Sequence, residues 1–273
     1  MLNDPDKESE NEPIEVRCYF VRNRNALAVR ADFGTLFRDY YLHLMQHEIK
    51  YGETLDTALK EALVGLSLHL ASRPRTEAHA WTLSWQDPLY NLFVTGSNQF
   101  GNVTGRIFTD DVRKRENNLF YTQITGNDSP TRMSTIEPES QNIFEIVEQY
   151  YLNSEQRPAR IFRYDTEDFV MVTAQPDCDM EWFHAQTDES IREMDQTEVL
   201  SLLETRSYTF DCGCSLFKLL PVLGDLSEES KEEVFGDDES EPTVITCPRC
   251  GARYLLTREM LDLYIEKQNS ESA

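Results

Sequence analysis

Four of the six cysteines lie in two close pairs near the C-terminus, and this spacing is typical of a metal site. The first pair is Cys212-Gly213-Cys214, and the second is Cys247-Pro248-Arg249-Cys250. Zinc prefers a tetrahedron of four soft ligands, which two short-range pairs can supply while the chain between them loops out. In the second pair, proline restricts the turn and Gly251 permits an open backbone. The sequence therefore predicts that Cys212, Cys214, Cys247 and Cys250 bind Zn²⁺.

The same four thiols have the chemistry of an oxidant sensor. Thiolates are the form of cysteine that oxidants attack. A one-residue spacer allows Cys212 and Cys214 to close only a small, strained disulfide ring, and strained disulfides are the labile, regulatory kind. Cys247 and Cys250 can close a second small ring. One site can therefore exist either as a zinc tetrathiolate or as two disulfides.

Loss of zinc is expected to unfold the C-terminal region. A structural zinc contributes about 10–16 kcal/mol in small metal-dependent modules. Apart from the metal, the segment from Ser207 to Ala273 is expected to have little core of its own. Within it, Asp225 to Glu241 holds nine acidic residues and one lysine, so we expect a self-repelling loop that buries little surface. Oxidation would then become a conformational signal.

Two other readings of the cysteines stay open. Cys247 and Cys250 could form a thioredoxin-like redox pair in a thiol oxidoreductase, although that motif opens a helix after a buried strand. Here Gly251 and an aromatic residue follow instead. A zinc ribbon that binds nucleic acid is the second alternative. A formal net charge of −23 opposes it, because the protein's field repels phosphate backbones.

Composition favours a folded protein of the cytoplasm. Hydrophobic residues make up 40% of the chain and aromatic residues 11%, which is enough for a packed interior. No apolar run approaches the roughly 20 residues that span a bilayer, so no membrane partner is expected. Residues 1–13 are acidic and lack an apolar core, which predicts a disordered tail rather than a signal peptide. In a reducing compartment, cysteines serve as metal ligands or redox groups more often than as structural disulfides.

Hydrophobic periodicity predicts an α+β fold with a mostly antiparallel sheet and packed helices. The expected helices cover 33–50, 54–70 (with Thr54 as N-cap) and 142–153. The expected strands cover 14–21, 26–31, 81–85, 89–95, 103–109, 119–125, 131–136, 160–164 and 169–173. Residues 188–206 read as a polar helix with a thin apolar stripe. We accordingly predict a disordered tail (1–13), an N-terminal α+β domain (14–185), a short helical connector (186–206) and a small C-terminal zinc module (207–273).

Through these cysteine pairs and several other stretches, the sequence resembles the heat-shock protein 33 family of redox-regulated chaperones. The resemblance covers about residues 14 to 268, and the Cys-x-Cys and Cys-x-x-Cys pairs are its most specific part. Further matching stretches are Asp87-Pro88-Leu89, Gly101 to Arg106 (GNVTGR), Tyr150 to Pro158 (YYLNSEQRP) and Cys247 to Tyr254 (CPRCGARY).

The resemblance implies an ATP-independent holdase and not an enzyme. Members of the family bind zinc and are inactive when reduced. When oxidised they lose zinc, form a disulfide within each close pair, unfold the linker and zinc module, and bind unfolding proteins. For this chain, the resemblance implies the disulfides Cys212–Cys214 and Cys247–Cys250. It also implies that residues 14–185 form the chaperone domain and residues 207–273 the redox switch. The resemblance also implies a homodimer in the active state.

Two departures from the family leave a second function open. The family has a longer linker before its first cysteine pair, whereas only about 30 residues lie between Met180 and Cys212 here. A Gly-Gly segment after the last strand is replaced by Ala174-Gln175-Pro176-Asp177. The alternative is a constitutive, zinc-stabilised protein-binding module without a redox switch.

The remaining candidate residues receive no functional role from the sequence. His43 and His47 lie four apart beside Glu48, but not in the His-Glu-x-x-His order of zinc hydrolases. Cys18 is expected in the core, and the acids beside Cys178 disfavour its thiolate. His69, His79 and His184 have no partner that the sequence reveals. We find no phosphate loop, nucleophile elbow or assignable carboxylate pair, so nothing supports an enzyme.

Overall fold

The structure, a computed structural model, describes residues 11–127, 129–236 and 241–271. The chain divides into two compact units: a larger one, Asn11–Cys212, and a smaller one whose described part begins at Gly213. Most of the predicted tail, residues 1–10, lies outside the described residues. The functional division into chaperone domain, connector and switch stays a prediction.

The larger unit is built on one ten-stranded sheet, in the order β7-β6-β3-β4-β5-β10-β1-β2-β9-β8. The strands are β1 Ile14–Val21, β2 Ala26–Asp32, β3 Glu77–Gln86, β4 Leu89–Ser97, β5 Asn102–Phe108, β6 Leu119–Gly126, β7 Ser129–Ile136, β8 Ala159–Arg163, β9 Asp168–Ala174 and β10 Leu200–Phe210. Every neighbouring pair is antiparallel except β5 and β10, which share a short parallel contact. The predicted α+β fold with a mostly antiparallel sheet is confirmed.

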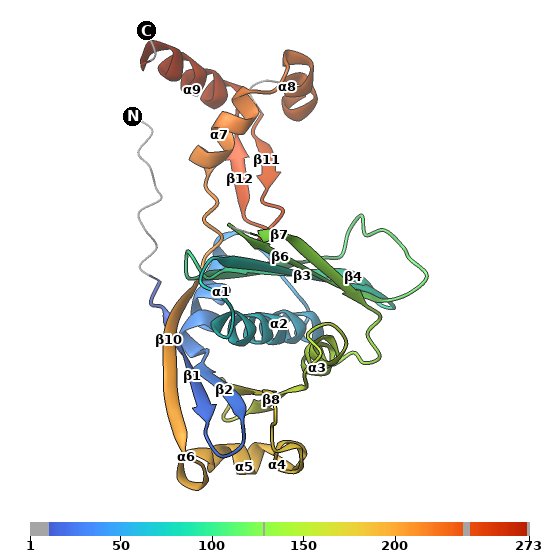
Figure 1. The fold of residues 1–273 in the computed structure, drawn as a ribbon. Coiled ribbons are helices and arrows are strands. Elements are labelled where there is room, and N and C mark those ends of the chain that lie inside the picture. Colours follow the sequence, from blue (N-terminus) through green and yellow to red (C-terminus); the bar gives the residue numbers. More distant parts are fainter. Residues whose placement is uncertain (1–10, 128, 237–240, 272–273) are drawn as a thin grey trace. The chain divides into compact units, whose positions relative to one another are not determined.

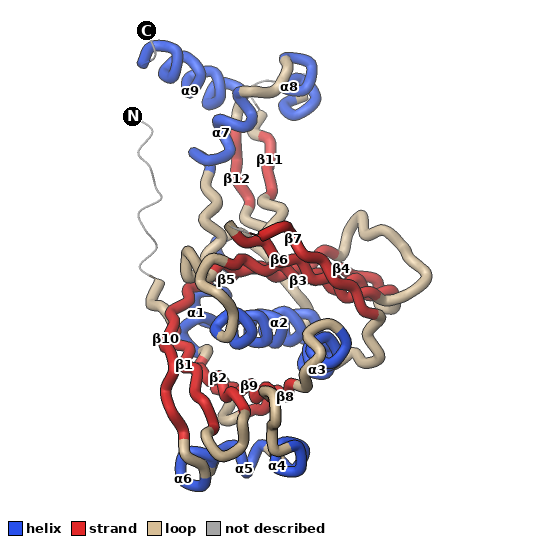
Figure 2. Tube along the Cα trace, in the orientation of Figure 1, coloured by secondary structure: helices blue, strands red, loops and turns tan. Residues whose placement is uncertain are grey.

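Helix α2 (Glu53–Ala71) lies between the two halves of this sheet, with α1 (Gly34–Gln46) and α3 (Ile143–Asn153) beside it (Figures 1 and 2). Its apolar stripe is fully buried: Leu59, Leu63, Leu66 and Leu70 are each 0% exposed. The three helices and both halves of the sheet share one apolar core. Burial of that stripe accounts for the helical periodicity that the sequence shows.

The ends of the first two helices differ from the prediction. Helix α1 stops at Gln46 rather than residue 50, because Glu48 adopts a left-handed backbone with φ of 54°. The N-cap of α2 is Gly52 in an extended conformation, so the prediction of Thr54 was wrong. Gly52 makes no side-chain capping bond; instead, Glu53 and Asp56 place negative charge in the first turn, where the helix dipole favours it.

The predicted helical connector was only partly right. Residues 188–206 begin with two short helices, α5 (Asp188–Arg192) and α6 (Met194–Thr197), and continue as β10. Strand β10 runs antiparallel to β1 from Leu200 to Tyr208. Pairing with β1 therefore outweighs the helical spacing of the apolar residues in this segment. Two of those residues, Leu202 and Leu203, are more than half exposed.

Residues 178–199, which include α4 (Met180–Ala185), α5 and α6, cover a second apolar cluster. The covering side chains are Phe183, Ile191 and Met194, each at most 4% exposed. The sheet contributes seven buried residues to this cluster: Val21, Ala26, Ala28, Phe162, Val170, Val172 and Ala174. We call residues 178–199 the covering segment.

The smaller unit has a far smaller core. Its elements are α7 Leu216–Gly224, α8 Glu228–Phe235, the hairpin β11 Thr243–Thr246 and β12 Arg253–Leu256, and α9 Arg258–Glu271. Four side chains are buried at its centre: Leu220, Phe235, Leu256 and Leu261. The acidic stretch predicted as a loop contains α8, which buries Phe235 and pairs Glu228 with Lys231 and Arg258. Within the described part of the chain, no helix is long and apolar enough to cross a membrane.

Candidate metal centre

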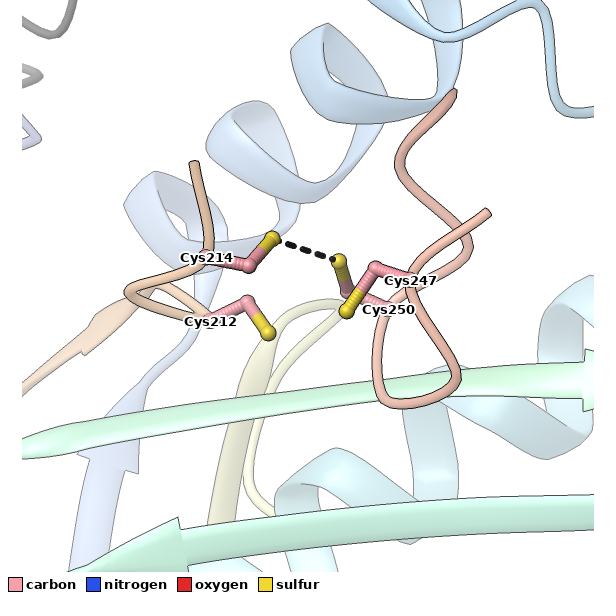
Figure 3. Close-up of side chains that lie close together, drawn as sticks. All are labelled: Cys212, Cys214, Cys247 and Cys250. Carbon is pink, nitrogen blue, oxygen red and sulfur yellow. Dashed lines mark hydrogen bonds between the residues drawn. The ribbon is translucent and has the colours of Figure 1, made fainter. Parts of the chain in front are cut away.

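The four paired cysteines come together, as the sequence predicts. The sulfur atoms of Cys212, Cys214, Cys247 and Cys250 all lie within 4.8 Å of one another (Figure 3). The first two follow the end of β10, and the last two lie in the turn between β11 and β12. Cys214 Sγ and Cys250 Sγ are 3.5 Å apart. Two short segments distant in sequence therefore present four thiols to one point.

Backbone geometry explains the short spacer of the first pair. Gly213 has φ of 64°, in the left-handed region where a side chain would be strained. This reversal permits both flanking sulfurs to face the same point. Ser215, next along the chain, caps α7 by accepting a hydrogen bond from the N–H of Lys218. The second cysteine of the pair is thus held directly before a helix N-terminus, where negative charge is stabilised.

The second pair sits in a tight knuckle closed by backbone hydrogen bonds. The Cys247 N–H donates to the Ala252 carbonyl at 2.8 Å, and the Gly251 N–H donates to the Cys247 carbonyl at 3.0 Å. Gly251 has φ of 79°, so here too glycine supplies a left-handed turn. The Ala252 N–H lies 3.4 Å from Cys250 Sγ and donates to it. Such N–H donors stabilise sulfur in its thiolate form.

The donor set fits zinc. Four sulfurs at about 2.3 Å from a tetrahedral Zn²⁺ lie about 3.8 Å from one another. The observed separations bracket that value, from 3.5 Å for one pair to an upper limit of 4.8 Å. Cys250 is 1% exposed, Cys247 5% and Cys212 9%, so most of the cluster is shielded from water. A bound zinc would cross-link the two segments and hold the thiols as thiolates.

Tyr254 on β12 supports the cluster with its hydroxyl group. The hydroxyl donates to the Cys214 carbonyl at 3.1 Å, and its oxygen also lies 3.1 Å from Cys214 Sγ. Burial, followed by the neighbouring Cys214 thiol, raises the pKa of Tyr254. From the sequence alone, this residue is only an aromatic that follows the second cysteine pair. Its hydroxyl instead fixes the position of Cys214.

We expect the substitution Tyr254→Phe to weaken zinc binding by about 10- to 100-fold, as loss of an outer-shell partner does in metal sites. The ring would still pack, so the unit should stay folded with zinc bound. Competition with a chromophoric chelator would measure the affinity. Tyr264→Phe is the matched control, because Tyr264 packs on the core of the same unit. An unchanged affinity in Tyr254→Phe would contradict the role of the hydroxyl.

The residues left without a role lie apart from this cluster. His43 on α1 and His47 directly after its end form a half-buried pair with ring centroids 4.8 Å apart. Cys18 is buried in β1, and burial raises the pKa of its thiol to about 11. The pKa of Cys178 is raised as well, chiefly by burial. The prediction that these two thiols are poor nucleophiles agrees with those shifts.

His69 and His79 do have partners, which the sequence did not reveal. Both rings are buried, at 0% and 1% exposed, and His69 Nε2 lies 3.0 Å from His79 Nδ1. Tyr151 Oη is 2.7 Å from His69 Nδ1, and Glu77 Oε2 is 3.0 Å from His79 Nε2. With both rings neutral, each contact has one donor and one acceptor: the tyrosine donates to His69, His69 to His79, and His79 to the carboxylate. A second proton on His79 would leave two N–H groups facing each other, that of His69 Nε2 and that of His79 Nδ1.

Because of the buried pair His69 and His79, the free energy of unfolding is expected to fall in acid. Burial lowers the pKa of His79 to about 4 and that of His69 well below its usual value. A depressed pKa means that the unfolded chain binds protons first. The stabilisation of the folded state by the two neutral histidines is therefore complete above about pH 6.5. It is lost as the pH falls towards 4, by up to about 1.4 kcal/mol of unfolding free energy per pH unit for each histidine.

Urea unfolding of the larger unit, followed by tryptophan fluorescence between pH 7.5 and 4.5, would measure this slope. His79→Asn should flatten it, whereas His184→Asn, at an exposed position, should leave it unchanged. Equal slopes in the wild type and the His79 variant would contradict the assignment.

Comparison with known proteins gives a consistent result. A family model described as Hsp33 protein matches residues 165–257. The 33 kDa chaperonin of Pectobacterium atrosepticum is 23% identical over 261 residues, covering 84% of this chain and 89% of that protein. The 33 kDa chaperonin of Edwardsiella ictaluri is 22% identical over 268 residues, covering 86% and 90%.

The fold agrees with these sequence matches. The crystal structure of the 33 kDa chaperonin (heat shock protein 33 homologue) of Thermotoga maritima superposes with a TM-score of 0.69. It covers 94% of this chain and 99% of that chain at 13% identity. The family model, the sequence relatives and the shared fold lead to one assignment, and they support placing this chain in the Hsp33 family.

Proposed function

We propose that this protein is a redox-regulated, ATP-independent holdase that captures unfolding proteins when its four-cysteine zinc centre is oxidised. The observation that carries the proposal is the cluster of four sulfurs within 4.8 Å at the start of a unit with only a small core. The relatives named 33 kDa chaperonin support the chaperone activity. The zinc and the redox switch rest on the cysteine chemistry.

The chemical step is thiol oxidation. One thiolate attacks hydrogen peroxide, forming a sulfenic acid and releasing hydroxide. The neighbouring thiolate attacks that sulfur, which forms the disulfide and releases a second hydroxide. Two electrons per disulfide pass to the peroxide, whose two oxygen atoms leave as hydroxide ions. We assign the disulfides to Cys212–Cys214 and Cys247–Cys250, because only one and two residues separate the members of each pair, which keeps them close whether or not the unit is folded.

Disulfide formation removes the thiolate donors, and the smaller unit then loses most of its stabilisation. Four buried apolar side chains are too few to hold such a unit, since domains this small need a metal or disulfides. Its acidic residues add repulsion once the fold loosens. The two small disulfide rings close over one and two residues, so they cannot replace a cross-link between distant segments.

The client surface in this proposal is the apolar cluster beneath the covering segment. Strand β10 connects that segment directly to Cys212. Unfolding that starts in the smaller unit can therefore progress along β10 into the covering segment. Release of Phe183, Ile191 and Met194 would expose seven apolar side chains of the sheet to non-native proteins. A contiguous apolar surface of this kind binds proteins through the hydrophobic effect.

The covering segment is held by polar contacts that are themselves accessible to water. Arg24 pairs with Asp179 at 2.7 Å and with Glu198 at 3.1 Å. Arg160 Nη1 donates to the Gln186 carbonyl at 2.8 Å, and Arg192 Nε donates to the Tyr164 carbonyl at 2.7 Å. Ion pairs that remain partly exposed contribute little, so the apolar contacts carry most of the attachment.

One observation favours the alternative, a constitutive zinc-stabilised binding module. Strand β10 is paired along its length with β1 and is part of the central sheet rather than a loose linker. If this pairing persists after oxidation, the covering segment stays in place and no switch operates. The two functions then differ in one respect: only the switch requires oxidation for client binding.

The remaining parts of the proposal concern partners and location. Clients are unfolded or misfolded proteins, and the active form is a homodimer. A net charge of −23 opposes binding to nucleic acid and to anionic membranes. We place the protein in the cytoplasm and assign it no enzymatic activity.

Client binding can be tested without ATP. A denatured client protein would be diluted into buffer with either the reduced, zinc-loaded protein or the peroxide-treated protein, and complexes would be separated by size exclusion. Complexes with the oxidised form alone are expected. Complexes with both forms would favour the constitutive alternative, and none with either form would contradict a chaperone.

A further inference from the structure

The two ends of the ten-stranded sheet differ in how their edges are protected. At the β8 edge, side chains cap the outward backbone N–H groups. The Ile161 N–H donates to Glu148 Oε1 at 2.8 Å, and the Arg163 N–H donates to Asp188 Oδ1 at 3.1 Å. Capping of this kind prevents another chain from adding to the sheet.

The β7 edge has no such protection. Among the residues that the structure describes, no strand pairs with the outer side of β7, and no side chain bonds the N–H groups of 131–136. Thr131, Arg132, Met133 and Thr135 are exposed, Met133 by 67%. An edge of this length and exposure is a template for an added strand.

A cleft of about 680 Å³ runs beside this edge. Strands β6 and β7 form one side, and the end of α3 with the turn after it forms the other. Ser134 Oγ and Ser154 Oγ, 2.5 Å apart, join the two sides. The cleft offers room for the side chains of a strand that pairs with β7.

The charges of the cleft select a cationic occupant. Arg132 is held by Glu77 at 2.6 Å, and Glu155 is held by Arg73. Within the described residues, Glu137 and Glu139 form no ion pair, so negative charge predominates. A second hollow of about 420 Å³ shares Glu137 and adds Asp87 and Glu116; no lysine or arginine is among the described residues that line it.

We propose that the β7 edge binds an extended, lysine- or arginine-bearing segment of a non-native protein by strand addition. Its backbone would pair with β7, its apolar side chains would lie on Met133, and its cationic side chains would face Glu137 and Glu139. This inference rests on the proposed function and specifies the kind of client segment: extended chains that carry basic residues. The edge alone gives weak, rapidly reversible binding, so complexes that survive size exclusion still require the apolar surface that oxidation releases. The β7 edge is separate from the surface beneath the covering segment.

A labelled eight-residue peptide of alternating lysine and valine is a direct probe, with binding to the full-length, zinc-loaded protein followed by fluorescence anisotropy. We expect binding that weakens with salt, and slowed amide exchange in 131–136. The glutamate–valine peptide should not bind. A lysine–valine peptide N-methylated at alternate residues should bind at least about tenfold more weakly, because it cannot complete the strand ladder.

The double variant Glu137→Gln/Glu139→Gln should weaken binding about tenfold. The matched control is Glu15→Gln/Glu145→Gln, which neutralises two exposed carboxylates elsewhere on the same unit. Equal binding of the N-methylated peptide, or an unchanged affinity in the cleft variant, would overturn the inference. Neither result affects the capture assay with oxidised protein, so failure of strand addition and failure of the chaperone function remain distinguishable.

Discussion

Replacing Cys247 with serine is expected to abolish tight zinc binding and to unfold the smaller unit while the ten-stranded sheet stays folded. A serine hydroxyl is a poor zinc ligand at neutral pH, so three thiolates would remain. Zinc contributes about 10–16 kcal/mol to comparable modules, and the four-residue core of this unit cannot offset such a loss. The larger unit has its own extensive core and should not depend on the metal.

Zinc content and amide hydrogen exchange would measure both effects in one preparation. Exchange should become fast in 216–271 and stay slow in α2 and the central strands. Cys178→Ser is the matched control, because that thiol lies outside the cluster and should leave zinc and exchange unchanged. A Cys247→Ser protein that retained one zinc and a protected α9 would contradict the assignment of the ligand set.

Replacing Phe183 with alanine is expected to detach the covering segment and to give chaperone activity without an oxidant. Phe183 is 1% exposed, and truncation of a buried phenylalanine costs about 3–5 kcal/mol. Ile191, Met194 and the partly exposed ion pairs would be left to hold α4 to α6, and of these the ion pairs contribute little. Zinc should stay bound, because the substitution is distant in sequence from all four cysteines.

Phe100→Ala provides the control, since it makes the same change at a residue that is 76% exposed. The reduced Phe183 variant should capture a denatured client and show fast amide exchange in 180–199, and the Phe100 variant should do neither. If the segment detached but no client bound, the client surface would lie elsewhere on the molecule.

Features encoded by local pattern could be predicted from the sequence. Hydrophobic periodicity identified β3 to β7, and it identified the strands at 14–21 and 26–31, which a short turn joins where Asn25 has φ of 48°. The paired cysteines were equally local signals, and the structure brings all four sulfurs together. In each case neighbours within a few residues determine the geometry.

Features that depend on distant partners could not be predicted. The sequence of strand β10 predicts a helix, because its pairing with β1 joins residues far apart along the chain, such as Ile14 and Tyr208. The acidic residues of α8 suggested a loop, yet Arg258 from α9 neutralises Glu228. His69 and His79 occur on a helix and a strand without any motif, and only the packing of α2 on β3 brings the rings together.

The central claim is that oxidation of the four-cysteine centre controls client binding. The most direct test follows zinc release with a chromophoric chelator and light scattering of a thermally unfolding client in parallel, at successive times after peroxide is added. Our account predicts that suppression of aggregation increases in proportion to the zinc released, and that dithiothreitol with zinc reverses both. Full suppression while zinc is retained, or complete zinc release without suppression, would contradict it.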